Sequence, residues 1–232
     1  MKRLILFDID GTLLSTNGAA RRAFHRAMLD VYGTAGPIDT HVFNGKTDPQ
    51  IARELLAAEG FTNEAVDGAL PRLFERYLHG MRHEVAQPTH TTSVYPGVRE
   101  LLDELHTSDD VVMGLLTGNI ADGAALKLGS VQLTEYFVLG AYGSDAEHRH
   151  ELPAIAVERA FERTGVRFDG KNVVIIGDTP SDVRCGQGIG AFAMGVCTGG
   201  HTRDELYAAG ADVVFDDLSE TVTVLDSLGL RV

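Results

Sequence analysis

Two aspartates stand two residues apart at the end of an apolar run, in the stretch LILFDIDGTLL, residues 4–14. In a partly dry site, Asp8 and Asp10 cannot both ionise unless a pKa rises or a cation neutralises them. Oxygen ligands of this kind suit Mg²⁺, which commonly uses one or two carboxylates, waters and a phosphate oxygen. The pair therefore predicts a metal site that attracts a phosphoryl group, although alone it could be a turn in which Gly11 has a positive φ.

Other polar clusters follow other apolar runs. Thr117, Gly118 and Asn119 come directly after VVMGLL, and Asp178 and Asp182 lie in GDTPSD, after VVII. The carboxyl ends of parallel strands meet at one edge of an open α/β sheet, where ligands bind. We therefore expect these groups to share one site with the first aspartate pair.

The elements that must position these residues alternate along the chain. Short, almost continuously apolar runs are separated by amphipathic helical patterns, which predicts an α/β fold with a doubly wound parallel sheet and right-handed crossovers. The expected strands are 3–8, 111–116, 136–140, 173–176, 191–196 and 212–215. Helices are expected at 97–106 and 152–164.

A long helical insertion separates the first two of these strands. It is far longer than one crossover needs. Helical patterns cover three stretches of it: 19–31, 48–59 and 63–84. In the second pattern we expect Asp48 at the N-cap and Pro49 at the first helical position. About 16–92 is therefore predicted to be an inserted helical domain, and 1–15 with 93–232 to form the core.

The motifs DIDGTLL, GLLTGN and GDTPSDV, in this order after successive apolar runs, resemble those of the haloacid dehalogenase-like phosphohydrolase superfamily. The resemblance covers the whole predicted core, and the helical insertion falls where that family carries its C1 cap. It implies a Rossmann-like core and Mg²⁺ as cofactor. The dehalogenase branch lacks the second aspartate. The presence of Asp10 therefore makes this sequence similar to the phosphatase and phosphomutase branches.

The resemblance implies a role for each matching residue. Asp8 would attack phosphorus and form an aspartyl phosphate. Asp10 would protonate the leaving oxygen and then deprotonate the attacking water. The metal would be held by the Asp8 carboxylate, the Asp10 backbone carbonyl and Asp178. The end of the second motif would bind the phosphoryl oxygens through Thr117, Gly118 and Asn119. Thr117 would also belong to the catalytic residues.

One element departs from the family pattern. The family usually has a lysine after the third motif strand, but residues 138–152 contain none. Arg149 is the best substitute by position, since arginine can bind phosphate in a fork; the alternative is a surface arginine. Lys127 is excluded because it lies in another segment, and Lys171 because it precedes VVII, on the far side of the sheet.

Two further residues have both a functional and a structural interpretation. Asp182 could lie near the metal, through a water or by holding Asp178, or it could cap a helix that begins after Thr179. Lys46, in the loop 41–50 of the predicted cap, could contact an anionic leaving group or be a solvated loop lysine. This loop looks most like that of the phosphoglycolate phosphatase branch.

The composition limits what the chain can bind. With 33 acidic residues against 20 lysines and arginines, the formal charge is −13, which disfavours nucleic acid and anionic membrane as partners. No apolar run is long enough to span a bilayer, and we expect no secretory signal. The two cysteines fit neither a disulfide framework nor a zinc pattern. We therefore expect a cytoplasmic protein that binds a small molecule.

Together these patterns predict a Mg²⁺-dependent phosphatase that hydrolyses a small phosphomonoester through an aspartyl phosphate. One alternative is a phosphomutase of the same superfamily, which must keep its aspartyl phosphate from water. Another is a non-catalytic phosphoacceptor or binding module, which would not need Asp10, Thr117 and Asp178 together. A nucleotide-binding oxidoreductase is disfavoured, because no GxGxxG follows the first strand.

Overall fold

A six-stranded parallel sheet forms the centre of the computed structural model, which describes residues 2–87 and 89–230. The strands lie in the order β5-β4-β1-β6-β7-β8. Their bounds are Arg3–Phe7 for β1, Val111–Thr117 for β4, Leu139–Tyr142 for β5, Val173–Gly177 for β6, Phe192–Val196 for β7 and Val213–Phe215 for β8. The strand order reverses between β1 and β6, the position at which doubly wound sheets bind ligands.

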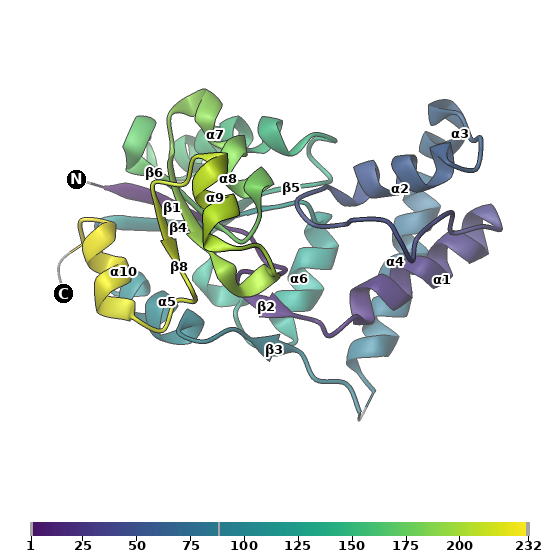
Figure 1. Cartoon of the computed structure of the whole chain (residues 1–232), viewed down its shortest axis with the longest axis horizontal. Coiled ribbons are helices and arrows are strands. Elements are labelled where there is room, and N and C mark those ends of the chain that lie inside the picture. Colours follow the sequence, from purple (N-terminus) through teal and green to yellow (C-terminus); the bar gives the residue numbers. More distant parts are fainter. Residues whose placement is uncertain (1, 88, 231–232) are drawn as a thin grey trace.

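Helices cover both faces of this sheet (Figure 1). Their bounds are Val98–His106 for α5, Ala121–Gly129 for α6, Leu152–Thr164 for α7, Pro180–Cys185 for α8, Arg203–Ala209 for α9 and Thr221–Ser227 for α10. Successive β1 side chains point to opposite faces. Ile5 and Phe7 pack with α5, α6 and α10, whereas Leu4 and Leu6 pack with α7. Because both faces are buried, the strand is continuously apolar.

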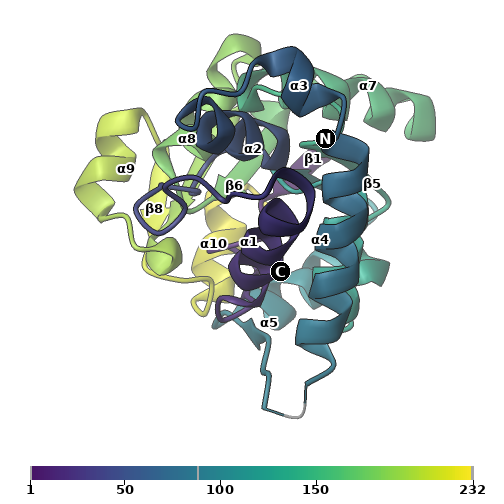
Figure 2. The ribbon, with the colours of Figure 1, turned by 90° about the vertical axis from the view of Figure 1, so that its right-hand side faces the viewer.

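A helical insertion lies beyond the carboxyl ends of the strands, on the right of Figure 1 and in front in Figure 2. It is connected to the core through β2 (Leu14–Ser15) and β3 (Ser93–Val94), which pair antiparallel. Its helices are α1 (Ala19–Tyr32), α2 (Asp48–Ala57), α3 (Asn63–Asp67) and α4 (Leu70–Val85). They enclose a hydrophobic core of their own, which Ile120 from the sheet domain joins.

The α/β class, the parallel sheet and the helical insertion are confirmed, and the boundaries of the predicted cap, 16–92, stay a prediction. The expected helix 63–84 is wrong, because the chain forms α3 and α4 instead. Pro71 lies in the first turn of α4 and has no N–H with which to continue a preceding helix. Within the described residues, no helix has the length and apolar character needed to cross a bilayer.

The N-cap predicted for α2 is also wrong by one residue. Thr47 is the N-cap: its backbone is extended, and its side chain accepts a hydrogen bond from the N–H of Gln50. Asp48 is therefore the first helical residue. A threonine oxygen can cap a helix as an aspartate oxygen does, so the sequence allowed either residue.

Leu6→Ala tests the packing of the central strand. Leu6 is fully buried between neighbouring strands and α7, so its truncation should lower the free energy of unfolding by about 2–5 kcal/mol. Val222→Ala, at a side chain that is 62% exposed, is the control and should change it by less than about 0.5 kcal/mol. Chemical denaturation measures both values, and similar small changes in the two variants would contradict the burial of Leu6.

Candidate active site

A pocket of about 330 Å³ opens at the carboxyl edge of the sheet, between the core and the insertion. It is lined by eight of the predicted site residues: Asp8, Asp10, Lys46, Thr117, Gly118, Asn119, Arg149 and Asp178. The ninth, Asp182, is buried and contacts Arg149. The structure thus brings together residues from three strand ends, as the motif positions predicted.

Asp8 lies at the end of β1 with a single cation beside it. Nη2 of Arg149 is 3.0 Å from its Oδ1, and both side chains are buried. Burial raises the pKa of Asp8 to about 6, although Arg149 lowers it; the charge of Asp182 adds to the rise. Asp8 is therefore a nearly dry carboxylate whose negative charge depends on Arg149.

Asp182 fixes Arg149 and caps α8 at the same time. Its Oδ2 accepts hydrogen bonds from the N–H and hydroxyl of Thr179, at 2.9 and 2.7 Å, so the predicted helix cap is present. Its Oδ1 accepts a bond from Arg149. The carbonyl of Leu116 accepts another bond from the same guanidinium at 3.2 Å. Both oxygens of Asp182 thus have partners, in Arg149 and in the first turn of α8. Its predicted place near the metal stays a prediction.

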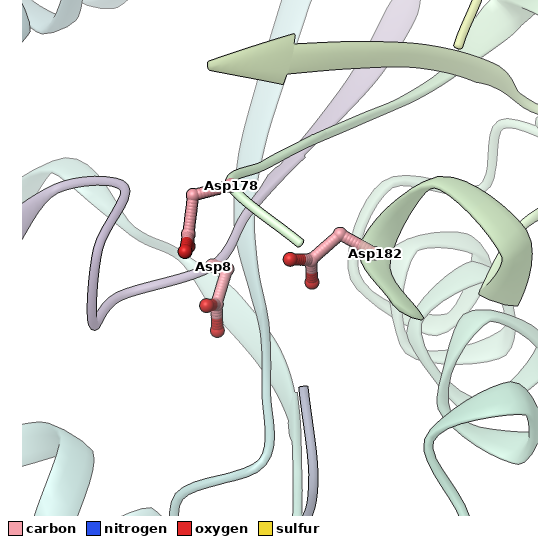
Figure 3. Close-up of side chains that lie close together, drawn as sticks. All are labelled: Asp8, Asp178 and Asp182. Carbon is pink, nitrogen blue, oxygen red and sulfur yellow. The ribbon is translucent and has the colours of Figure 1, made fainter. Parts of the chain in front are cut away.

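Three buried carboxylates lie close together at the carboxyl edge of the sheet (Figure 3). Asp8, Asp178 and Asp182 each have an oxygen within 4.8 Å of the others. Burial raises the pKa of Asp178 well above its usual value, and the charges of Asp182 and Asp8 raise it further. Thr12 donates a hydrogen bond to one oxygen of Asp178 at 2.9 Å. This crowding fits a hard divalent cation, which the three carboxylates could hold.

The absence of a side chain at Gly11 leaves space for the carboxylate of Asp178. The φ of Gly11 is +86°, and a Cβ atom there would lie 2.4 Å from Oδ2 of Asp178. A side chain at this position would therefore be strained and would also displace the carboxylate.

Asp10 has a second, separate cation. Nζ of Lys127 is 2.6 Å from its Oδ2, and Nδ2 of Asn119 donates to the same oxygen at 2.8 Å. Nζ of Lys127 also donates to Oδ1 of Asn119 at 2.6 Å. Although burial lowers it, the pKa of Lys127 lies above its ordinary value because Asp10 is beside it. The site thus contains two cation–carboxylate pairs.

Lys127, which was set aside because of its segment, nevertheless lines the pocket and pairs with Asp10. Arg149, the substitute chosen by position, is the cation beside Asp8. Helix α6 begins at the sheet edge and turns its buried stripe, which includes Ala124 and Leu128, toward the core. Lys127 lies next to this stripe and is 3% exposed. A lysine on the buried stripe of a helix needs a partner, and this was the signal in the sequence that could have identified it.

The insertion supplies the opposite wall of the pocket. Lys46 lines it and is not a solvated loop lysine, because its Nζ pairs with Glu54 and lies 3.4 Å from Nε2 of His41. Arg21 lines the same wall, with its guanidinium 4.5 Å from the centroid of the Phe43 ring. Its hydrogen-bond acceptors are backbone carbonyls, and it has no ion pair within the described residues. No pattern in the sequence singles out Arg21, which is one basic residue among several on its helix.

The insertion also docks on the core beside the pocket. Oγ1 of the buried Thr47 donates to the carbonyl of Glu147 at 2.5 Å, and Arg53 pairs with the carboxylate of Glu147 at 2.5 Å. A Cβ atom at Gly118 would lie 2.0 Å from the carbonyl oxygen of Lys46, so glycine permits this close approach. The pocket is therefore covered by the loop that precedes α2.

Comparisons with known proteins relate the chain to phosphatases. A family model for haloacid dehalogenase-like hydrolases matches residues 5–196. "Probable phosphatase IndB" of Dickeya dadantii is 29% identical, over 98% of this chain and 95% of that protein. A phosphoglycolate phosphatase of Pseudomonas fluorescens is 27% identical, over 96% and 79%. A hydrolase structure from Pseudomonas syringae has the same fold, with a TM-score of 0.72 and 23% identity over 98% of this chain and 99% of that one.

Asp8→Asn should remove a pH-dependent loss of stability in buffer without divalent cations. The pKa of Asp8 is about 6 in the folded chain, against an ordinary value of 3.8. The folded chain therefore binds this proton more tightly, and the wild type should lose about 3 kcal/mol relative to the variant as pH rises from about 3 to 7, of which about 2 kcal/mol between about pH 4 and 6. Denaturation across this range measures the difference, and a difference that does not change with pH would contradict the buried state of Asp8.

Proposed function

Because the chain belongs to the haloacid dehalogenase-like hydrolase family, we propose that it is a Mg²⁺-dependent phosphatase that hydrolyses a small phosphomonoester through an aspartyl phosphate at Asp8. The observation that carries this proposal is the presence of two separate cation–carboxylate pairs in one pocket, Arg149 with Asp8 and Lys127 with Asp10. Two phosphatases among the relatives support it. The reaction needs a nucleophile and an acid/base group of different character, and the two pairs supply them.

Asp8 is the proposed nucleophile. Arg149 holds its Oδ1, which leaves Oδ2 to attack phosphorus. Arg149 is itself held by Asp182 and by the carbonyl of Leu116, so the direction of the attacking oxygen is fixed. A fixed direction favours phosphoryl transfer, because attacking and leaving oxygens must lie roughly in line.

Asp10 is the proposed acid and base. Lys127 and Asn119 both bond its Oδ2, which leaves its Oδ1 to exchange a proton with the leaving oxygen and then with water. Oγ1 of Thr117 accepts hydrogen bonds from the N–H and Nδ2 of Asn119, at 3.3 and 2.8 Å. The Thr117 hydroxyl hydrogen is therefore available for a phosphoryl oxygen.

The carboxylates of Asp8 and Asp178, with the backbone carbonyl of Asp10, are the proposed ligands of Mg²⁺. When bound, the ion would neutralise negative charge on the phosphoryl oxygens. The support for this is the crowding of buried carboxylates whose pKa values are raised by burial.

The substrate proposed is a phosphomonoester whose leaving group carries a second negative charge. Lys46, the residue singled out for this role in the sequence, is already paired with Glu54. Arg21 has no carboxylate partner within the described residues and lines the same wall. We therefore assign contact with an anionic leaving group chiefly to Arg21, and phosphoglycolate is a suitable probe.

Release of phosphate from a panel of small phosphomonoesters, with and without Mg²⁺, tests the proposed function. The wild type should require Mg²⁺, and Asp8→Asn should lower kcat by at least about a thousandfold, because the nucleophile is lost. Asp226→Asn, at an exposed aspartate of α10, is the control and should behave as the wild type. No release by the folded wild type would overturn the proposal. A lasting phosphoryl group on Asp8 with interconversion of sugar phosphates would indicate a mutase.

The role of Arg21 is tested with phosphoglycolate and 2-hydroxyethyl phosphate, which differ in charge but hardly in size. Arg21→Gln should lower kcat/KM for phosphoglycolate by about 10- to 100-fold, since a charged hydrogen bond contributes about 1.5–3 kcal/mol. The value for 2-hydroxyethyl phosphate should change by less than about threefold, and Lys46→Gln should have the smaller effect on phosphoglycolate. Equal losses on both substrates in Arg21→Gln would contradict recognition of the leaving-group charge.

A further inference from the structure

One residue of the insertion makes two hydrogen bonds to the core loop that follows β4. The backbone N–H of Asp48 donates to the carbonyl of Gly118 at 2.8 Å, and its Oδ2 accepts from the N–H of Ile120 at 2.8 Å. We propose that Asp48 is a positioning residue that couples docking of the insertion to the orientation of Asp10. The inference rests on the proposed function, in which Asp10 moves the protons.

The two bonds hold the peptide groups on either side of Asn119. That side chain is buried, and its Nδ2 donates to Oδ2 of Asp10 and to Oγ1 of Thr117, each at 2.8 Å. Its Oδ1 accepts from Nζ of Lys127 at 2.6 Å. A shift of the loop would therefore move a side chain that bonds Asp10, Thr117 and Lys127.

The same contact stabilises the start of the helix that carries Lys127. Ile120 is the N-cap residue of α6, and its apolar side chain makes no capping bond. The Asp48 carboxylate accepts the N–H of Ile120 itself, as the N3 side chain of a capping box would, and puts a negative charge at the positive end of the helix. Helix α6 then extends from this contact to Lys127, whose Nζ meets Asp10. Two routes thus connect Asp48 to the same carboxylate.

This contact is distinct from those that hold the insertion in place. Thr47 and Arg53 both bond Glu147, which lies in a different segment of the core. The insertion also has a hydrophobic core that includes Ile120. Loss of the Asp48 carboxylate should therefore leave the insertion docked and free the loop around Asn119.

The kinetic test compares Asp48→Ala and Asp48→Asn. The first should lower kcat by about 10- to 100-fold and change KM by less than about threefold, because Asp10 is misplaced while the pocket remains. The second should stay within about threefold of the wild type in kcat, because its amide oxygen can still accept from Ile120. Asp122→Ala is the matched control: it removes an exposed acid from the first turn of α6, without a bond to the loop, and should leave kcat unchanged.

A second readout does not depend on activity. Asp48→Ala should speed exchange of the Ile120 amide hydrogen by at least about tenfold and shift the side-chain amide resonance of Asn119, whereas Asp48→Asn and Asp122→Ala should change neither. An unchanged Asn119 resonance, wild-type kcat in Asp48→Ala, or equal losses in Asp48→Ala and Asp48→Asn would overturn the proposal. If Asp48→Ala does not fold, Asp48→Glu, which moves the acceptor by one methylene, should show the same losses.

The two readouts separate this inference from the proposed function. If the folded wild type released no phosphate from any substrate, the proposed function would fail. The exchange and resonance measurements would still report whether Asp48 holds Asn119. Normal phosphatase activity with an unaltered Asn119 in Asp48→Ala would instead overturn the coupling alone.

Discussion

Three carboxylates meet in a nearly dry space where β1 and β6 end, and their mutual repulsion must be relieved for the chain to fold as it does. Arg149 provides part of that relief from within the protein. It enters from the segment before α7 and reaches both Asp8 and Asp182. The same Nη2 that makes both contacts also donates to the carbonyl of Leu116, whereas the buried Nε of Arg149 has no hydrogen-bond partner within the described residues. The remaining excess of negative charge is what makes the edge suitable for a divalent cation.

This crowding explains why Asp8 and Asp10 have different cation partners. One arginine cannot neutralise both Asp8 and Asp10 and still be held by Asp182. Lys127 comes from a different helix and pairs with Asp10, and Asn119 bonds both groups. Asp8 and Asp10 are therefore oriented by separate elements. A change at one pair need not disturb the other.

A site residue could be predicted from the sequence when the strand before it fixes its position. Asp8, Thr117 and Asp178 follow apolar strands directly, so the carboxyl edge of a parallel sheet brings them together whatever the helices do. The capping contact of Asp182 is equally local, since it spans three residues. Lys127, Arg21 and Asp48 reach the pocket from helices, and the direction of a helix is set by packing that no single segment encodes. For the same reason, six strands could be predicted, although the one expected at 136–140 is β5, Leu139–Tyr142. The break between α3 and α4 was missed although Pro71 marked it in the sequence.

The narrow attachment of the insertion has an evolutionary consequence. Ser15 and Ser93 are paired in the β2–β3 ribbon, so the chain leaves the core and returns to it through adjacent strands. Everything between them can lengthen, shorten or be exchanged without separating these two points. Arg21 and Lys46 lie within that stretch, whereas Asp8, Asp10 and Asp178 lie outside it. Selection can therefore alter the pocket wall that the insertion supplies while the sheet edge that carries the aspartates is inherited unchanged.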